Sequence, residues 1–321
     1  MTEAGHVIAL CGGVGGAKLA FGLAQVLEPD RLSIVVNTGD DFRHLGLHVS
    51  PDIDTVAYTL SGLADRERGW GIGGETWNFL TSLRRLGGED WFQLGDQDLA
   101  MHVERSRRLA AGQGLSQITA DLASRLGVRP AVIPMTDDAV RTIIQTADGE
   151  LEFQRYFVAE RCRPIATGVR FDGVEGARPS ESFARALARK DMAAVIICPS
   201  NPYLSVDPIL AIPGVREGLR NLSVPIVAVS PIVGGQAIKG PAAKLMTELG
   251  VTPGVLAVAD HYRGLLDGLV IDEADAADET PLRERGLPAL VTASIMSSDE
   301  DRARLGKACL AFARGLSPVE R

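Results

Sequence analysis

The sequence predicts an α/β protein with a mainly parallel sheet and helices on both faces. Short apolar runs recur along the chain, glycine or polar residues follow each run, and helical patterns separate them. This alternation of strand and helix is typical of a parallel, Rossmann-like open sheet. With no internal repeat and no clear linker, we expect a single domain over residues 1–321, with a helical and hairpin elaboration over about 70–190.

Composition excludes several classes of protein. A net charge of −8 argues against nucleic acid as a partner, and means that an anionic substrate needs a bound cation or a local cluster of Arg and Lys. No apolar run is long enough to span a membrane, and no signal peptide is evident. The scattered cysteines Cys11, Cys162, Cys198 and Cys309 fit reduced thiols and argue against a structural zinc site. We therefore expect a cytoplasmic location.

The first element is a buried strand from His6, followed by a glycine-rich loop and a helix that carries Leu19, Leu23 and Leu27. Glycines allow close approach of a ligand, and the N–H groups that open a helix attract phosphate. The loop departs from a Walker A motif and from a strict dinucleotide fingerprint, so a plain strand-to-helix turn is the alternative. The candidate nucleotide-binding residues here are Gly12, Gly13, Gly15, Gly16 and Lys18.

A second buried strand, residues 32–36, runs into Asn37-Thr38-Gly39-Asp40-Asp41, and residues 50–55 add Asp52 and Asp54. Ligands of open α/β sheets lie at the carboxyl ends of the strands. These acids are oxygen ligands of the kind that Mg²⁺ takes together with substrate phosphates. The alternative is that Asp52 or Asp54 caps a helix.

Residues 70–130 look helical and irregular. Within them, Trp91 to His102 mixes aromatic and polar residues, a composition suited to a flat conjugated ring and its hydroxyls. Asp98 and His102 are four residues apart and would share one helix face. Strands are expected at 131–133, 142–146 and 151–157, with an Asp148-Gly149 hairpin turn between the last two. A helix follows near residues 181–190.

The C-terminal half returns to strand, loop and helix. Strands are expected at 194–198, 225–229, 255–258, 268–271 and 289–291. Ser200, Asn201 and Ser230 would then lie at the same sheet edge as the glycine loop, with Lys239 as a nearby cation. Simple turn chemistry explains each of these polar residues equally well.

Six motifs in this order make the chain resemble the 2-phospho-L-lactate transferase family of coenzyme F(420) biosynthesis. The motifs span residues 12–19, 36–41, 50–55, 91–96, 199–202 and 230–232, and the resemblance covers nearly the whole chain. It implies transfer of a phosphorylated three-carbon acid from a guanosine diphosphate-linked donor to the terminal ribityl hydroxyl of the deazaflavin Fo, with release of GMP. It also implies a homodimer.

The resemblance further implies roles for individual residues. Asp54 and Gln93 would contact Fo, Asp40 and Asp41 would hold Mg²⁺ or lie beside it, and the loops 12–16 and 200–202 would receive the guanylate. We place four further residues among the substrate contacts, namely Asn37, Thr38, Asp96 and His102. The remaining candidate nucleotide contacts are Ser200, Asn201, Pro202 and Ser230.

The reaction needs in-line positioning, charge neutralisation and a group that accepts the hydroxyl proton. Asp40, Asp41 and Asp54 are the candidate bases, with Asp54 first because of its assignment to Fo. Phospholactate, phosphoenolpyruvate and phosphoglycerate all stay open as the acid. Two other classes also stay open: a non-catalytic regulatory protein that binds nucleotide sugars, and a Rossmann-type oxidoreductase. The Trp91 to Asp96 stretch argues against the first, and Asn37 in place of a ribose-binding acid argues against the second.

Overall fold

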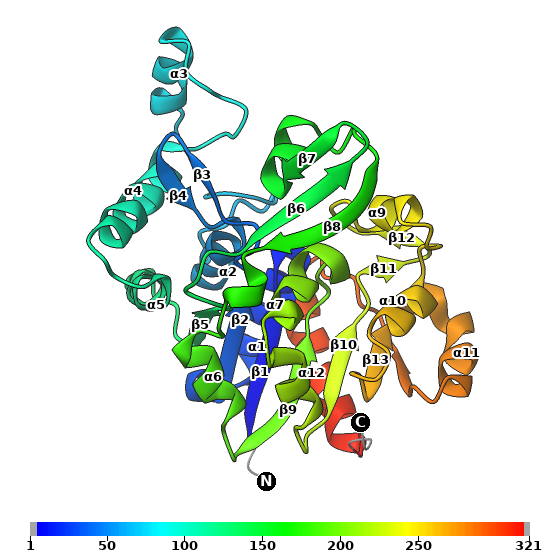
Figure 1. The fold of residues 1–321 in the computed structure, drawn as a ribbon. Coiled ribbons are helices and arrows are strands. Elements are labelled where there is room, and N and C mark those ends of the chain that lie inside the picture. Colours follow the sequence, from blue (N-terminus) through cyan, green and yellow to red (C-terminus); the bar gives the residue numbers. More distant parts are fainter. Residues whose placement is uncertain (1–4, 318–321) are drawn as a thin grey trace.

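A seven-stranded, fully parallel sheet forms the centre of the protein in the computed structural model, which describes residues 5–317 (Figure 1). The strand order is β14-β13-β10-β9-β1-β2-β5. Counted along the chain this is 3-2-1-4-5-6-7, so the direction of winding reverses between β1 and β9. The strands are β1 (His6–Cys11), β2 (Leu32–Val36), β5 (Ala131–Pro134), β9 (Met192–Ile197), β10 (Ile226–Val229), β13 (Gly268–Ile271) and β14 (Ala289–Val291).

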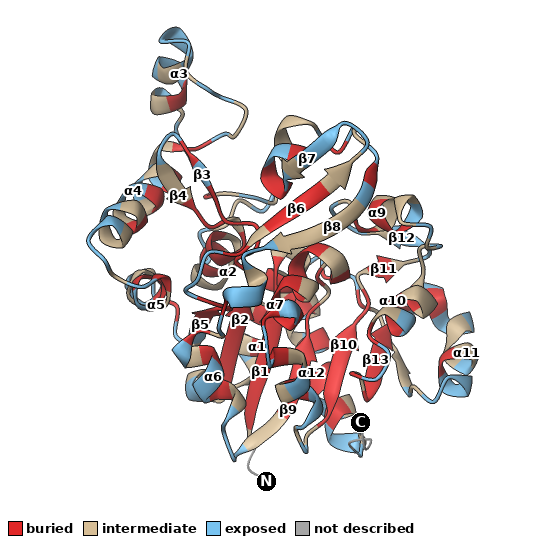
Figure 2. Ribbon diagram, viewed as in Figure 1, coloured by how far each residue is buried: buried red, intermediate tan, exposed pale blue. Residues whose placement is uncertain are grey.

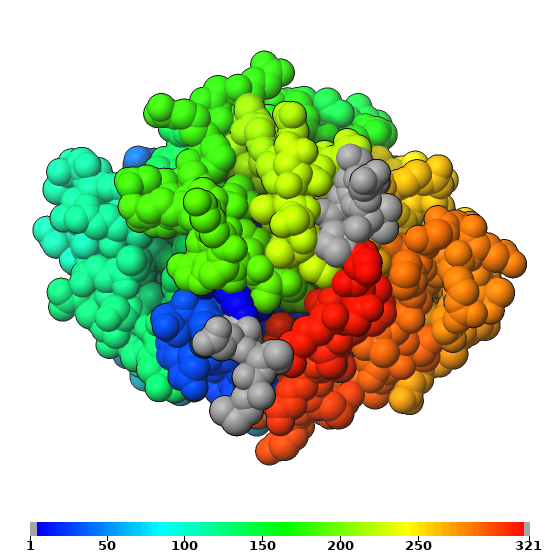
Figure 3. All heavy atoms as spheres, turned by 90° about the horizontal axis from the view of Figure 1, so that it is seen from below, coloured from blue at the N-terminus to red at the C-terminus, as the bar shows by residue number. Residues whose placement is uncertain are grey.

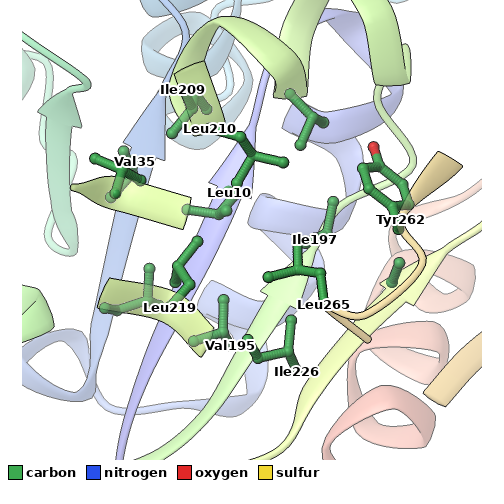
Figure 4. Packing of buried hydrophobic residues seen from close by; sticks show 14 of the residues in the cluster. Leu10, Val35, Val195, Ile197, Ile209, Leu210, Leu219, Ile226, Tyr262 and Leu265 are labelled. Atoms are coloured by element: carbon green, nitrogen blue, oxygen red, sulfur yellow. The ribbon is translucent and has the colours of Figure 1, made fainter. Parts of the chain in front are cut away.

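Helices cover both faces of this sheet because alternate residues of each strand point to opposite sides. Ile8 and Leu10 of β1 belong to one apolar cluster, shown in Figure 4, whereas Val7 and Ala9 belong to the other. The first cluster packs against α6 (Glu181–Leu187), α7 (Asp207–Ala211), α8 (Val215–Arg220), α9 (Ala242–Glu248), α10 (Val255–His261) and α11 (Glu279–Glu284). The second packs against α1 (Gly13–Val26), α2 (Pro51–Ser61), α5 (Leu115–Arg125) and α12 (Asp299–Gly315).

The C-terminal helix α12 lies directly against α1 on one face of the sheet, and Figure 3 shows residues of the C-terminal part of the chain beside residues of the N-terminal part. Gly22 permits this approach, because a Cβ built there would clash with the Arg302 carbonyl oxygen. Gly306 faces the same point of contact from α12. The packing fixes α1, and with it the glycine loop at the N-terminal end of that helix.

The elaboration lies at the carboxyl ends of the strands. Its parts are the hairpin β3 (Phe42–His44) and β4 (Leu47–Val49), the helices α3 (Asn78–Arg85) and α4 (Asp96–Ala110), and an antiparallel sheet of β6 (Arg141–Thr146), β7 (Gly149–Glu152) and β8 (Ala166–Asp172). Helix α3 projects from the body and is largely exposed, whereas most residues of the central strands are buried and the edge strand β14 is half-buried (Figure 2). The predicted hairpin turn at Asp148-Gly149 is confirmed.

Three expectations about elements are corrected. The strand expected over 151–157 ends at Glu152, and a π-helical turn η2 (Arg155–Ala159) follows, in which Tyr156 is buried; Phe153, just before this turn, is buried as well. Residues 255–258 begin helix α10, because their short apolar run fits a buried helix as well as a strand. Strand β5 pairs with β2 in the central sheet instead of belonging to the mid-chain addition.

The remaining elements are short. They are η1 (Pro29–Arg31), η3 (Val174–Gly176), η4 (Pro202–Val206), η5 (Glu273–Asp278), β11 (Ile232–Val233) and β12 (Gln236–Ala237). Among the helices of the described chain, none has both the length and the apolar character needed to cross a bilayer.

Candidate active site

A cavity of about 1080 Å³ lies at the carboxyl ends of the central strands, below the elaboration. This is the place where ligands bind in sheets that reverse their winding. The core contributes the glycine loop, the loop after β9 and residues 294–297, and the elaboration contributes residues 68–70, 91–93 and 153–161. Far-separated parts of the chain therefore enclose one site.

The glycine loop is bound to its neighbours on two sides. Ser200 Oγ accepts a hydrogen bond from Gly12 N (3.1 Å) and donates one to Gly12 O (2.8 Å). On the other side, Gly13 N donates to Asp52 Oδ1 at 2.8 Å. A Cβ on Gly15 would clash with the Pro199 carbonyl oxygen, whereas a Cβ on Gly13 would meet no atom within 4 Å. Close packing of three segments therefore requires most of these glycines, and only Gly13 faces open space.

Buried carboxylates lie beside this loop. Asp52 accepts a second hydrogen bond from Asn37 Nδ2 at 3.0 Å, and its burial raises the pKa of Asp52 to about 6. Asn37 Oδ1 in turn accepts from Gly39 N at 2.7 Å, which shapes the turn that carries Asp40. Burial, together with the nearby charge of Asp52, holds the pKa of Asp40 well above its usual range. Asp40 lines the cavity.

The oxygens of Asp40 and Asp41 fit a magnesium ion that substrate phosphates complete. Asp41 Oδ2 accepts from Ser50 Oγ (2.8 Å) and is 2.9 Å from His48 Nε2. Its other oxygen, and Oδ1 of Asp40, are buried and have no hydrogen-bond partner among the described residues. Within residues 5–317, no three His, Cys, Asp or Glu side chains gather into a metal site. Mg²⁺ typically takes only one or two carboxylates from the protein, so the two orphaned oxygens match its needs.

Asp54 belongs to a different, fully buried network. Both of its oxygens bind the guanidinium of Arg105, with Nη1 to Oδ2 at 3.0 Å and a second bond from Nη2 to Oδ1. His102 Nδ1 lies 3.7 Å from Asp54, and His102 Nε2 lies 3.2 Å from Asp98 Oδ1. Tyr58 Oη donates to the same Asp98 oxygen at 2.7 Å. The network fastens α4 to α2, and the expected shared helix face of Asp98 and His102 is confirmed.

Part of the predicted site lines the cavity. Those lining residues are Gly12, Gly13, Gly15, Lys18, Asp40, Gln93, Ser200, Asn201 and Ser230. Other candidates lie outside the lining, namely Gly16, Asn37, Thr38, Asp41, Asp54, Asp96, His102 and Pro202. Asp96 accepts hydrogen bonds from Thr76 Oγ1 (2.6 Å) and Phe79 N (3.0 Å), which lower the pKa of Asp96 to about 2 and tie α4 to the start of α3.

Several lining residues were not predicted from the sequence. Asp52 was named from the sequence only as a magnesium ligand or a helix cap, and its contact with the glycine loop was not predicted. Trp70 and Phe157 supply aromatic walls, and Arg68 and Arg161 supply cations. The last four come from loops and from η2, where no local pattern marks a side chain as facing a cavity.

The fold and the site together define the class of protein. A Rossmann-ordered sheet carries a glycine loop and a carboxylate cluster at its reversal point, and an aromatic roof closes a cavity of cofactor size over them. This arrangement defines a Rossmann-like α/β protein with a ligand site at the reversal point of its sheet.

Comparison with known proteins identifies the family. Residues 7–306 match the profile described as "2-phospho-L-lactate transferase CofD". The 2-phospho-L-lactate transferase of Methanosarcina mazei is 38% identical over 301 residues, which cover 94% of this chain and 98% of the relative. The phosphoenolpyruvate transferase of Streptomyces coelicolor is 38% identical over 314 residues, covering 96% and 98%. The chain belongs to the CofD family.

A solved structure supports the fold. A UPF0052-family protein of Bacillus halodurans superposes with a TM-score of 0.64, covering 97% of this chain and 100% of that one, at 16% identity. The expected α/β fold and the expected family are confirmed, and with the family the transferase function in coenzyme F(420) biosynthesis. The comparisons thus favour the transferase over the regulatory protein and the oxidoreductase.

Proposed function

We propose that this chain transfers a phosphorylated three-carbon acid from a guanosine diphosphate-linked donor to the terminal ribityl hydroxyl of Fo, releasing GMP. The observation that carries the proposal is the position of Asp40, a buried carboxylate that lines the cavity beside the glycine loop. The family relationship supports both substrates, because the relatives named above are 2-phospho-L-lactate and phosphoenolpyruvate transferases.

The cavity has two chemically distinct ends that suit the two substrates. Lys18, Ser200 and Ser230 lie at the sheet edge, where polar hydrogen-bond groups and a cation suit a guanylate. Trp91 and Phe92 belong to the elaboration, where they offer flat apolar surface to a deazaflavin ring. We propose that the donor occupies the first end and Fo the second, so that the ribityl chain reaches Asp40.

Asp40 and Asp41 would hold Mg²⁺, which when bound neutralises charge on the diphosphate of the donor and on the departing GMP. Asp41 suits this role because Ser50 and His48 hold its Oδ2 and leave Oδ1 for the ion. We keep Mg²⁺ dependence as a proposal, tested by the loss of turnover on chelation and its return with added Mg²⁺.

Asp40 is the carboxylate we propose as general base. It lines the cavity, whereas Asp41 and Asp54 do not, and both oxygens of Asp54 are bound by Arg105. The ribityl oxygen forms a bond to the phosphorus that carries the three-carbon acid, its proton passes to Asp40, and GMP leaves with the electron pair of the broken P–O bond.

The test is mass spectrometry of Fo after incubation with the protein, Mg²⁺ and three guanylated donors in competition, carrying phospholactate, phosphoenolpyruvate or phosphoglycerate. A mass increase of Fo establishes the transfer and names the acid. Fo that is unchanged with all three donors, and that fails to bind in a fluorescence titration, refutes the proposal.

We also propose a cytoplasmic homodimer. The four cysteines are all free and buried, which suits a reducing compartment, and the dimer rests on the resemblance to the family. Sedimentation equilibrium measures the assembly directly: a mass of one chain, 34.1 kDa, across the working concentration range contradicts the dimer.

A further inference from the structure

Four cationic side chains line the cavity, and they differ in what they already bind. Lys18 Nζ donates to the Met296 carbonyl oxygen at 2.8 Å, and Arg68 pairs with Asp65 at 2.8 Å. Lys239 lies near enough to Lys18 for its charge to contribute to the lowered pKa of Lys18, after the larger effects of burial and Arg302. Arg161 has no ion-pair or side-chain hydrogen-bond partner among residues 5–317.

The backbone at Arg161 is unusual. Arg161 and Cys162 both have φ of 52°, and Leu45 is the one other non-glycine residue of the described chain with positive φ. Left-handed backbone is unfavourable for residues that carry a Cβ, and glycine normally occupies such positions. Strain of this kind persists where the surrounding structure enforces it, and it gathers at ligand sites.

Neighbouring contacts hold the turn in this conformation. Cys162 N donates to the Tyr156 carbonyl oxygen at 2.9 Å, and both side chains are buried in the small core between the elaboration and η4. Lys244 Nζ fixes the other end of Tyr156 by a hydrogen bond to its Oη at 3.1 Å. With Cys162 directed into this core, the preceding residue, Arg161, is exposed and lines the cavity.

We propose that Arg161 binds the carboxylate of the three-carbon acid in the donor and so determines specificity for an acid. The inference rests on the proposed function. The diphosphate is matched at the sheet edge, by Lys18 and by the metal that Asp40 and Asp41 would hold, which leaves the carboxylate as the donor anion without a partner there. A guanidinium matches a carboxylate by two parallel hydrogen bonds, and Arg161 enters from the elaboration, on a segment separate from the sheet edge.

The carboxylate that Arg161 would bind is common to all three candidate acids. This contact therefore selects phosphorylated acids against simple phosphate esters, and it does not discriminate among phospholactate, phosphoenolpyruvate and phosphoglycerate. Arg161 is a specificity residue in this scheme, and the chemistry of proton transfer stays with Asp40.

The experiment compares Arg161→Gln with Arg163→Gln in steady-state kinetics. Arg163 is a matched control, because it belongs to the same turn, pairs with Glu160 at 2.9 Å and lies outside the cavity lining. Arg161→Gln is expected to raise KM for the donor by at least about tenfold and to leave KM for Fo unchanged, since one charge-assisted contact is lost. Arg163→Gln is expected to change neither constant. An unchanged donor KM in Arg161→Gln overturns the proposal.

Binding of GDP, which has phosphates and no carboxylate, tests whether Arg161 binds the carboxylate or a phosphate of the donor. The Kd of GDP is expected to be the same in the wild type and in Arg161→Gln, whereas an equal weakening of GDP and donor would assign Arg161 to phosphate and overturn the carboxylate contact. Arg161→Gly guards against misfolding, because it relieves the left-handed backbone and is expected to keep the Tm while reproducing the defect in donor KM. A wild-type protein that never modifies Fo refutes the proposed function instead.

Discussion

Replacing Arg105 by Met tests the buried network around Asp54. Arg105 on α4 is 2% exposed and Asp54 on α2 is 5% exposed, and the guanidinium binds both carboxylate oxygens. Removing one partner of such a pair leaves an uncompensated buried charge. We therefore expect Arg105→Met to lower the free energy of unfolding by about 3–5 kcal/mol.

A double-mutant cycle isolates the pair. In Arg105→Met/Asp54→Asn the buried charge is gone, so the double variant should lose at least about 2 kcal/mol less than the sum of the two single losses. Equilibrium unfolding in urea at neutral pH measures all four proteins. Additivity within about 0.5 kcal/mol would refute the reasoning, because it would mean that the two side chains do not interact across α2 and α4.

The same variants decide the role of Asp54. It was the first candidate for the general base, and its contact with Fo stays a prediction. If Asp54→Asn unfolds normally and yet abolishes turnover, Asp54 acts in the site directly. If instead it loses stability together with Arg105→Met and keeps a measurable kcat when folded, Asp54 serves to position α2, whose first turn also carries Asp52.

Three further predictions concern the cavity. Asp40→Asn should lower kcat about 10²–10⁴-fold with a native circular dichroism spectrum, and near-normal turnover would remove Asp40 as the base. Gly15→Ala should lower the free energy of unfolding by about 1–3 kcal/mol, because its Cβ would clash with the Pro199 carbonyl oxygen. Gly13→Ala should lower it by about 1 kcal/mol, because its backbone φ of 64° is unfavourable for alanine and no atom crowds the new Cβ. Equal losses of stability for the two variants in thermal melts would contradict this. The carboxylate of Asp52 has a pKa raised to about 6, so it costs stability above that pH and costs none below its unfolded value of 3.8. Asp52→Asn should therefore gain stability relative to wild type as pH rises from about 4 to 7, by up to about 3 kcal/mol in metal-free protein, and a pH-independent difference in urea titrations would count against the shift.

Local patterns predicted the parts of the site that belong to the central sheet. The apolar run of β1 and the glycines after it identify a buried strand and a close turn without any long-range information. The same is true of Asp40 and Asp41, which lie in the loop after β2, and of Ser200 in the loop after β9. Parallel strands place their carboxyl ends at one edge, so the sequence brings these residues together by topology alone.

Local patterns failed where a segment's shape depends on its neighbours. Residues 255–258 form a helix because Val255 and Val258 pack on one side against the sheet, a choice that a short apolar run cannot make. Arg161 faces the cavity because Tyr156 and Cys162 anchor the turn before and after it. The sequence predicted Asp54 as the first candidate for the general base and gave no sign of its pairing with Arg105, because Arg105 lies 51 residues away in the chain.

The sequence by itself determined the strand–loop–helix order, the family and the sheet edge at which the ligand groups gather, because periodicity and motif order are properties of neighbouring residues. Only the tertiary structure decided which of the carboxylates face the cavity. It bound Asp54 to Arg105, placed Asp52 against the glycine loop and left Oδ1 of Asp40 and of Asp41 without a hydrogen-bond partner among the described residues. Burial and pairing of this kind depend on segments that meet only after folding.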